Sequence, residues 1–209
     1  MSTCIQEMEQ TYRVPPGRNA YIGKGGFPMA RAATLEQAES DHPSHWPLAL
    51  ARIVIGVLWF TQVLWKLPPD FGCGPDQSKG LCDWIAREIQ SPLLPPYAAF
   101  LQNIVLPGLG IFGWMTFLLE ASIAISLIFG LLSRLGGLLG TLQSLNLLIG
   151  LWAVPGEWYW SYIMLTLFCA LFMLMAPGRI FGLDAKLRPR FADMAASGST
   201  LGRLGLLAS

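Results

Sequence analysis

Four long apolar runs constrain the fold of this chain more than any other feature. They cover about residues 46–67, 110–132, 135–153 and 158–176. As a helix, each run can cross a bilayer core of roughly 30 Å. Only 13% of the residues are charged, whereas a soluble domain carries about 25%. The pattern predicts an all-α membrane protein with four transmembrane helices.

The lengths of the connections predict how these spans are arranged. The second and third connections are short, and short connections place consecutive helices antiparallel, in an up-down bundle. The first, residues 68–109, is long, and its segment Tyr97–Leu106 has the apolar spacing of a short helix lying on the outer membrane surface. We therefore divide the chain into an N-terminal extension (1–45), a four-helix transmembrane domain (46–178) and a C-terminal tail (179–209).

The distribution of Lys and Arg predicts the orientation, because cytoplasmic segments are enriched in these residues. They precede the first span, occupy the second connection as Arg134, and follow the fourth span, whereas acidic residues balance them in the first connection. This pattern predicts a multi-pass protein of the inner (cytoplasmic) membrane with both termini cytoplasmic. The net charge of +1 and the lack of a basic patch interleaved with aromatics give no reason to expect nucleic acid.

Glu120 lies near the middle of the second run. A carboxylate at that depth costs about 2.5 kcal/mol or more, so it normally faces protein, water or a ligand. Two interpretations stay open. Glu120 takes a proton during quinone reduction or holds a polar substrate, or it is a neutral carboxyl that bonds Asn146 or Gln143.

Arg52 is the expected partner of Glu120. Arg52, Gly56, Trp59 and Lys66 share one helical face of the first span. Helical rise places Arg52 and Glu120 about 9 Å apart along the membrane normal, within reach of two extended side chains. We expect them to be coupled, directly or through water; the alternative is that Arg52 extends to the cytoplasmic headgroups.

A polar strip in the bundle interior is the predicted ligand site. Arg52 and Glu120 are its candidate catalytic residues, Arg52 to stabilise negative charge and Glu120 to relay protons. The candidate cofactor-binding residues are Asn146, Gln143, Trp59 and Gln62. Asn146 and Gln143 also fit a purely structural role, as hydrogen-bonding residues between helices.

Cys73 and Cys82 both fall in the first connection, on the predicted outer side. An oxidising compartment favours a local disulfide between them, with two free thiols as the alternative. No haem-binding Cys-x-x-Cys-His, metal-cluster motif or dinucleotide-binding fingerprint is present in the sequence.

Three motifs, taken in order, resemble the DoxX/DoxD membrane family. They are Arg52-Ile-Val-Ile-Gly56 with Trp59-Phe60 and Lys66; Glu120 followed by Gly130-Leu131-Leu132-Ser133-Arg134; and Gly178-Arg179-Ile180-Phe181-Gly182-Leu183-Asp184-Ala185. The resemblance covers about residues 46–190. It implies a four-helix membrane subunit of a redox system, and its DoxD branch is similar to the membrane subunit of thiosulfate:quinone oxidoreductase.

The resemblance makes a subunit of a quinone-linked oxidoreductase the leading functional hypothesis, with a quinone or a sulfur oxyanion in the bundle interior and other protein subunits as partners. The alternative is a non-catalytic accessory subunit of a larger photosynthetic or respiratory membrane complex. The apolar tail residues Leu201, Leu204, Leu206 and Leu207 favour that alternative, because they would otherwise be exposed. A transporter is less favoured, since no inverted repeat is visible.

Overall fold

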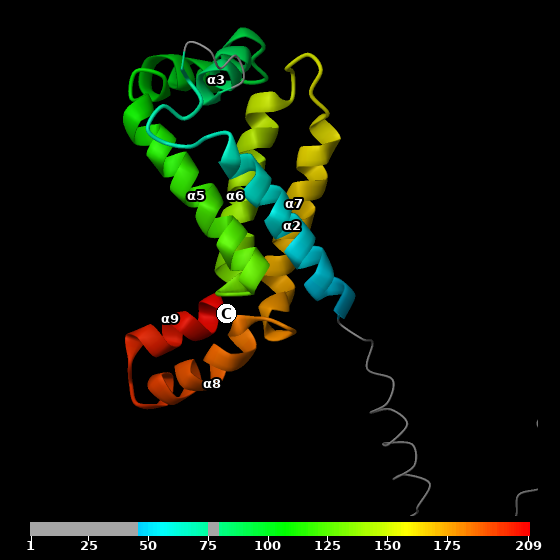
Figure 1. Cartoon of the computed structure of the whole chain (residues 1–209), viewed down its shortest axis with the longest axis vertical. Helices are drawn as coiled ribbons and strands as arrows, with labels where there is room; N and C mark the ends of the chain where they lie inside the picture. The colour runs from blue at the N-terminus through cyan, green and yellow to red at the C-terminus, as the bar shows by residue number, and fades with distance from the viewer. Residues whose placement is uncertain (1–45, 75–79) are drawn as a thin grey trace, which may run out of the picture. The chain divides into compact units, whose positions relative to one another are not determined.

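The structure is a computed structural model that describes residues 46–74 and 80–209. The expected N-terminal extension, residues 1–45, lies outside the described residues. Within them the protein is helical, without strands (Figure 1). The α-helices are α2 (Trp46–Leu64), α3 (Leu81–Gln90), α4 (Pro95–Phe100), α5 (Leu109–Phe129), α6 (Ser133–Leu151), α7 (Tyr159–Met175), α8 (Leu183–Ala196) and α9 (Thr200–Ala208).

Each of the four apolar runs forms one long helix, α2, α5, α6 or α7. By length and composition, α2 and α5 are sufficient to cross a membrane. Helix α7 is apolar but has only 17 residues, a length of about 26 Å. Helix α6 has 19 residues and is less apolar, because glycines and polar side chains interrupt its leucines.

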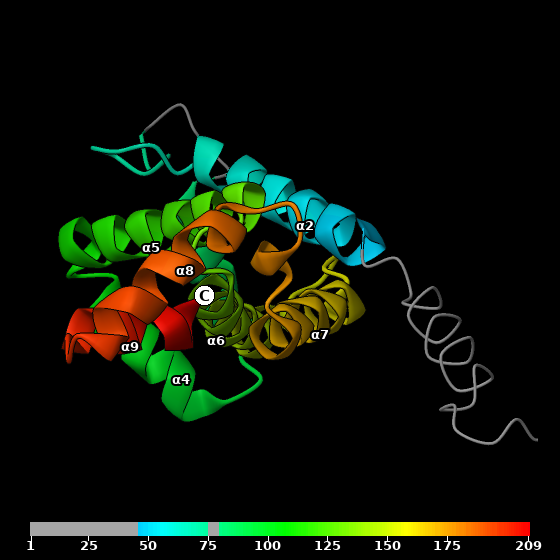
Figure 2. The ribbon, with the colours of Figure 1, turned by 90° about the horizontal axis from the view of Figure 1, so that it is seen from below.

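The four long helices pack as two antiparallel pairs. Helix α2 packs chiefly on α5, and α6 packs chiefly on α7, while α5 and α6 join the pairs. Helices α2 and α7 touch each other little (Figures 1 and 2). The shared core contains residues of α2, α5 and α7: Ile55, Trp59, Ile123, Ala124, Leu127, Cys169 and Phe172. The weak contact between α2 and α7 leaves space on that side of the bundle.

Glycines allow the close helix contacts. A Cβ atom at Gly56 would lie 2.8 Å from the backbone nitrogen of Ile128, and one at Gly137 would lie 2.5 Å from that of Met173. Backbone atoms cannot move aside as a flexible side chain can, so both positions require glycine for this packing. The α6 glycines therefore explain why a helix of moderate hydropathy packs so extensively on α7.

The predicted interior faces are right for two of the long helices. Arg52, Gly56 and Trp59, predicted on one face of the first span, are buried in α2, Lys66 is buried two residues beyond the end of that helix, and Glu120 is buried in α5. Of the two third-span residues predicted in the bundle interior, Gln143 is buried but Asn146 is exposed, so the prediction for Asn146 is wrong. The face of α6 that is buried instead follows its small residues: Ser133, Gly136, Gly137, Gly140 and Ser144.

The end of the bundle next to α8 is closed by hydrogen bonds to helix termini. Arg52 donates from Nη1 to the carbonyl of Leu127, 2.8 Å away, in the last turn of α5. Asp184 accepts from the backbone N–H groups of Leu132 (2.6 Å) and Ser133 (2.8 Å), at the start of α6. Both contacts satisfy backbone groups that a helix end leaves without a partner. We call this set of contacts the α8-end junction.

Left-handed backbone permits the sharp turn inside this junction. Gly130 ends α5 with φ +64°, a conformation that glycine adopts without steric cost. A Cβ atom there would also collide with the guanidinium of Arg52. The junction thus joins residues that lie far apart in the sequence, and its visible role is to hold helix ends together.

The first connection forms the other end of the bundle. A disulfide joins Cys73 and Cys82, with Cα atoms 5.6 Å apart, as predicted. The predicted short helix at Tyr97–Leu106 is present as α4 followed by a π-helical turn, Leu101–Val105. Helix α3 packs on this segment through a small core of Ile85, Leu101 and Val105.

Candidate functional site

Glu120 forms its ion pair with Lys66, not with Arg52. The ammonium of Lys66 lies 2.6 Å from both carboxylate oxygens of Glu120, and both side chains are almost fully buried. The amide of Gln143 donates a further bond of 3.3 Å to Glu120. The predicted Arg52–Glu120 pair is therefore wrong as a direct contact, since Arg52 turns to backbone carbonyls at the α8 end.

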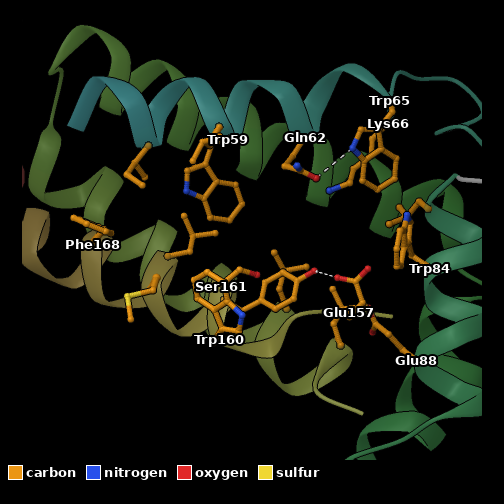
Figure 3. Close-up of a pocket in the computed structure, with 18 residues that line it drawn as sticks. Trp59, Gln62, Trp65, Lys66, Trp84, Glu88, Glu157, Trp160, Ser161 and Phe168 are labelled. Carbon is orange, nitrogen blue, oxygen red and sulfur yellow. Dashed lines mark hydrogen bonds between the residues drawn. The ribbon is translucent and has the colours of Figure 1, made fainter. Parts of the chain in front are cut away.

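A pocket of about 820 Å³ lies beside this ion pair. Its walls come from α2 and the two residues after it, one side of α3, the end of α6, and α7 with Glu157 before it (Figure 3). Lys66 lines the pocket and Glu120 lies behind it. The volume falls within the range of sites that hold drug-sized or cofactor-sized molecules, roughly 300–1,000 Å³.

The pocket has an apolar end and a polar end. Figure 3 shows Trp59 and Phe168 at one end, and Lys66, Glu88 and Glu157 gathered at the other, next to α3. Aromatic rings frame the polar end, where the Lys66 ammonium lies 4.4 Å from the ring centre of Trp65. This division of polarity suits an amphiphilic molecule with a polar head and an apolar body.

The mouth of the pocket lies on the side where α2 and α7 separate. Leu58, Trp160 and Met164 line the pocket but are 51%, 49% and 46% exposed, whereas Trp59 is only 1% exposed. The exposed lining residues come from α2 and α7, and the deeply buried one faces the core. A molecule can therefore reach the pocket sideways, between these two helices.

Glu88 is a second acid at the polar end, and no pattern in the sequence distinguishes it. Its carboxyl lies against Gly150 of α6, where a Cβ atom would come within 2.9 Å of Oε1. Burial raises the pKa of Glu88 to about 7, and Tyr97 and Lys66, which both favour the ionised form, offset this only in part. Glu88 is thus the acid of the pocket that titrates near neutral pH.

The raised pKa of Glu88 predicts that the protein loses stability as pH rises. The folded protein holds this proton up to pH about 7, whereas the unfolded chain, with an ordinary pKa of 4.5, releases it earlier. Between pH 4.5 and pH about 7, the folded state therefore binds more protons than the unfolded state. The free energy of unfolding falls by up to about 3 kcal/mol as pH rises through this range. The unfolding midpoint in nanodiscs should drop between pH 5 and pH 8.

A glutamine at this position isolates the effect. Glu88→Gln should flatten the pH dependence in that window, because the amide does not titrate. Asp83→Asn, on the same helix, is the matched control and should leave the slope unchanged, since Asp83 is partly exposed and pairs with Arg87. An equal slope in the wild type and the Glu88→Gln variant would show that Glu88 is not the titrating group.

Glu157 is the third acid at the polar end. The phenol of Tyr162 donates a hydrogen bond of 2.6 Å to its Oε2 atom. The lining therefore carries two carboxyls, Glu88 and Glu157, and one ammonium, Lys66, whose charge Glu120 already matches. The net charge of these groups is negative, which disfavours binding of an anion and suits a neutral or proton-donating ligand.

The structure separates the sequence-predicted site residues into three groups. Trp59 and Gln62 line the pocket, and Glu120 and Gln143 lie behind it. Arg52 is at the α8-end junction. Asn146 is exposed at the other end, where it accepts a bond of 3.1 Å from Tyr97.

Three contributors to the site were missed or misread in the sequence. Glu88 and Trp84 come from α3, within the first connection, for which only a surface helix at Tyr97–Leu106 and a disulfide were predicted. Lys66 was placed on the same helical face as Arg52 but was not selected as a site residue, yet it is 4% exposed and paired with Glu120. The buried face of α2 already contained the signal, because Lys66 continues the spacing of Arg52 and Trp59.

No protein-family model, curated protein or solved structure matches this chain, so its function has to be inferred from the chemistry of the pocket.

Proposed function

We propose that α2, α5, α6 and α7 are four antiparallel spans of the inner membrane, with α8 on the cytoplasmic side and α3 on the outer side. The hydropathy of α2 and α5 supports this. So do the basic residues near α8, because cytoplasmic segments retain such residues. The disulfide next to α3 fits an oxidising outer compartment.

We further propose that the pocket binds an isoprenoid quinone and that the protein is the membrane subunit of a quinone-linked oxidoreductase. The observation that carries this proposal is a pocket with a polar end and an apolar end that opens sideways between α2 and α7. A quinone has the matching form, with a polar ring on an apolar tail, and it diffuses within the bilayer. The order of the DoxX-like motifs gives independent support.

The residues of the pocket can take part in quinone reduction through protons and hydrogen bonds. Reduction of a quinone adds two electrons and two protons, which convert both carbonyl groups to hydroxyls. Lys66 can donate a hydrogen bond to one carbonyl, and Glu88 can supply one of the two protons from its carboxyl, with the second proton coming from water. Electrons come from the oxidation of a donor on a partner subunit, and an anionic donor such as thiosulfate is bound there, away from the acidic pocket.

A quinone-binding measurement tests this proposal. The full chain in nanodiscs is titrated with ubiquinone and menaquinone analogues, and binding is followed by tryptophan fluorescence, because Trp59, Trp65 and Trp84 line the pocket. Ser161 lies in the lining, and Ser161→Trp should fill part of the space. Its affinity for quinone should fall by about tenfold or more, equivalent to ~1.4 kcal/mol.

Ser122→Trp is the matched control. Like Ser161, Ser122 is exposed on a long helix and bonds the carbonyl three residues earlier at 2.7 Å, but it does not line the pocket. Its quinone affinity should equal that of the wild type. If neither analogue binds the wild type, or both variants bind equally, the pocket is not a quinone site.

A further inference from the structure

Helix α9 carries a row of exposed leucines. Leu201, Leu204 and Leu207 are 69%, 61% and 67% exposed. Their spacing of three residues places them along one side of the helix. Scattered exposed apolar residues are normal, but an aligned row marks a surface that contacts another apolar phase.

The other side of α9 is occupied by α8. Gly202 packs against the backbone of Met194, and Gly205 packs against the ring of Phe191, so closely that neither has room for a Cβ atom. At 100° per residue, Leu204 and Leu207 fall on the face directed away from α8. Helix α9 lies between α8 and the ends of α5 and α6 (Figure 1) and contacts α6. Leu204 and Leu207 therefore lie on the side of α9 that α8 leaves uncovered.

The same region is strongly basic. Residues 179–209 hold five basic residues, Arg179, Lys186, Arg188, Arg190 and Arg203, against Asp184 and Asp193. Asp184 is buried, with both oxygens bonded to N–H groups of α6. Among the described residues, none of the five forms a salt bridge.

The guanidinium groups of Arg179 and Arg188 share one acceptor at the α8 end of the bundle. Desolvation, and then the positive charges of Arg188 and Arg134, lower the pKa of Arg179, with Asp184 opposing them. Arg134 belongs to the first turn of α6, and Arg179 follows α7 directly. Arg179 and Arg188 also donate to the main-chain oxygen of Ser209, at 2.7 Å and 3.5 Å. If the long helices span a bilayer, their ends, and with them these arginines, lie at the depth of the lipid phosphates.

We propose that the α8–α9 hairpin lies on an anionic lipid surface, with the leucine row of α9 in the acyl boundary and the arginines beside it bound to lipid phosphates. An in-plane helix with an apolar face and nearby cationic groups binds acidic membranes in this way. The inference rests on the part of the proposed function that places the four long helices across a bilayer. It does not depend on quinone.

Spin labelling of the full chain in nanodiscs tests the position of α9. With Cys4 replaced by serine, Cys73 and Cys82 bonded and Cys169 buried, a single introduced cysteine carries the label. The label at Leu204→Cys should be several-fold more accessible to oxygen, which partitions into lipid, than to a water-soluble nickel chelate. A label at Arg190→Cys, exposed on α8, should show the opposite preference.

A label at Leu118→Cys, exposed in the middle of α5, separates this inference from the span assignment. Lipid access at position 118 together with nickel access at position 204 would overturn the inference alone. No access of either reagent at position 204 would overturn it too, because a second copy or a partner protein would then cover α9. Water access at position 118 would overturn the spans and the inference together.

Native mass spectrometry tests the charge component. Nanodiscs that contain phosphatidylglycerol and phosphatidylcholine should release the wild type with phosphatidylglycerol bound preferentially. Arg179→Gln combined with Arg188→Gln should reduce that retention several-fold, whereas Arg87→Gln, on α3, should not. Equal retention by all three proteins would show that the arginines do not bind lipid phosphate.

Discussion

Lys66→Met should destabilise the protein by about 3–5 kcal/mol, because it leaves the carboxylate of Glu120 buried without its cationic partner. The remaining hydrogen bond from Gln143, at 3.3 Å, cannot replace a charge. Glu120 is expected to take up a proton instead, which limits the loss. The free energy of unfolding in mixed micelles measures the effect.

A second substitution should restore much of that stability. Lys66→Met together with Glu120→Gln removes both charges and leaves two amides, at positions 120 and 143, that can bond each other. Lys186→Met, at an exposed site on α8, should change stability by less than about 0.5 kcal/mol. If the double variant were no more stable than Lys66→Met alone, the loss would come from packing and not from an unpaired charge.

Asp184→Ala should cost about 2–4 kcal/mol, the second largest effect that we expect. The substitution leaves the N–H groups of Leu132 and Ser133 without acceptors at the start of α6, and each orphaned buried donor costs about 1–3 kcal/mol. It also removes the carboxylate beside the guanidinium of Arg52. Chemical unfolding followed by circular dichroism measures the loss.

Two further variants define the role of Asp184. Asp184→Asn keeps one side-chain oxygen as an acceptor, so its loss should be intermediate. Asp193→Ala removes an exposed carboxylate from the same helix and should change stability little. Similar losses for Asp184→Ala and Asp193→Ala would attribute the effect to the charge of α8 and not to the capping of α6.

The helices were predictable because apolar run length and turn residues are local signals. Each of the four runs forms one helix. Gly130 ends α5 in the left-handed conformation, which commonly terminates helices and which glycine favours. The disulfide was predictable from the compartment implied for Cys73 and Cys82. Whether all four helices cross a bilayer stays a prediction, since only α2 and α5 meet that test.

The site was less predictable, because it depends on contacts between distant segments. The rise per residue of a helix indicated that Arg52 could reach Glu120. The rise alone does not show that Lys66 lies nearer to Glu120 than Arg52 does. Lys66 follows α2 directly, and its chain turns inward to Glu120 near the α3 end. The role of Glu88 depends on the packing of α3 against Gly150, which no periodicity in the sequence encodes.

Polar residues on α6 illustrate the same limit. Gln143 and Asn146 lie three positions apart and were expected to share an interior face. The close approach of α7 to Gly137 and Gly140 sets the rotation of α6, which buries Gln143 and exposes Asn146. The spacing of the α6 glycines, taken as the surface that packs on a neighbouring helix, would have predicted this rotation better than the positions of the polar residues did.

The α8-end junction also determines when the bundle can become complete during synthesis. The first turn of α6 depends on Asp184, which a ribosome adds about fifty residues after Ser133. The separation is larger for Arg52, because its second acceptor, the carbonyl of Phe181, is added 129 residues after it. The junction therefore joins the residues on the two sides of the boundary that we drew at residue 178. A nascent chain halted after α7 would hold its four long helices without the contacts that fix their ends.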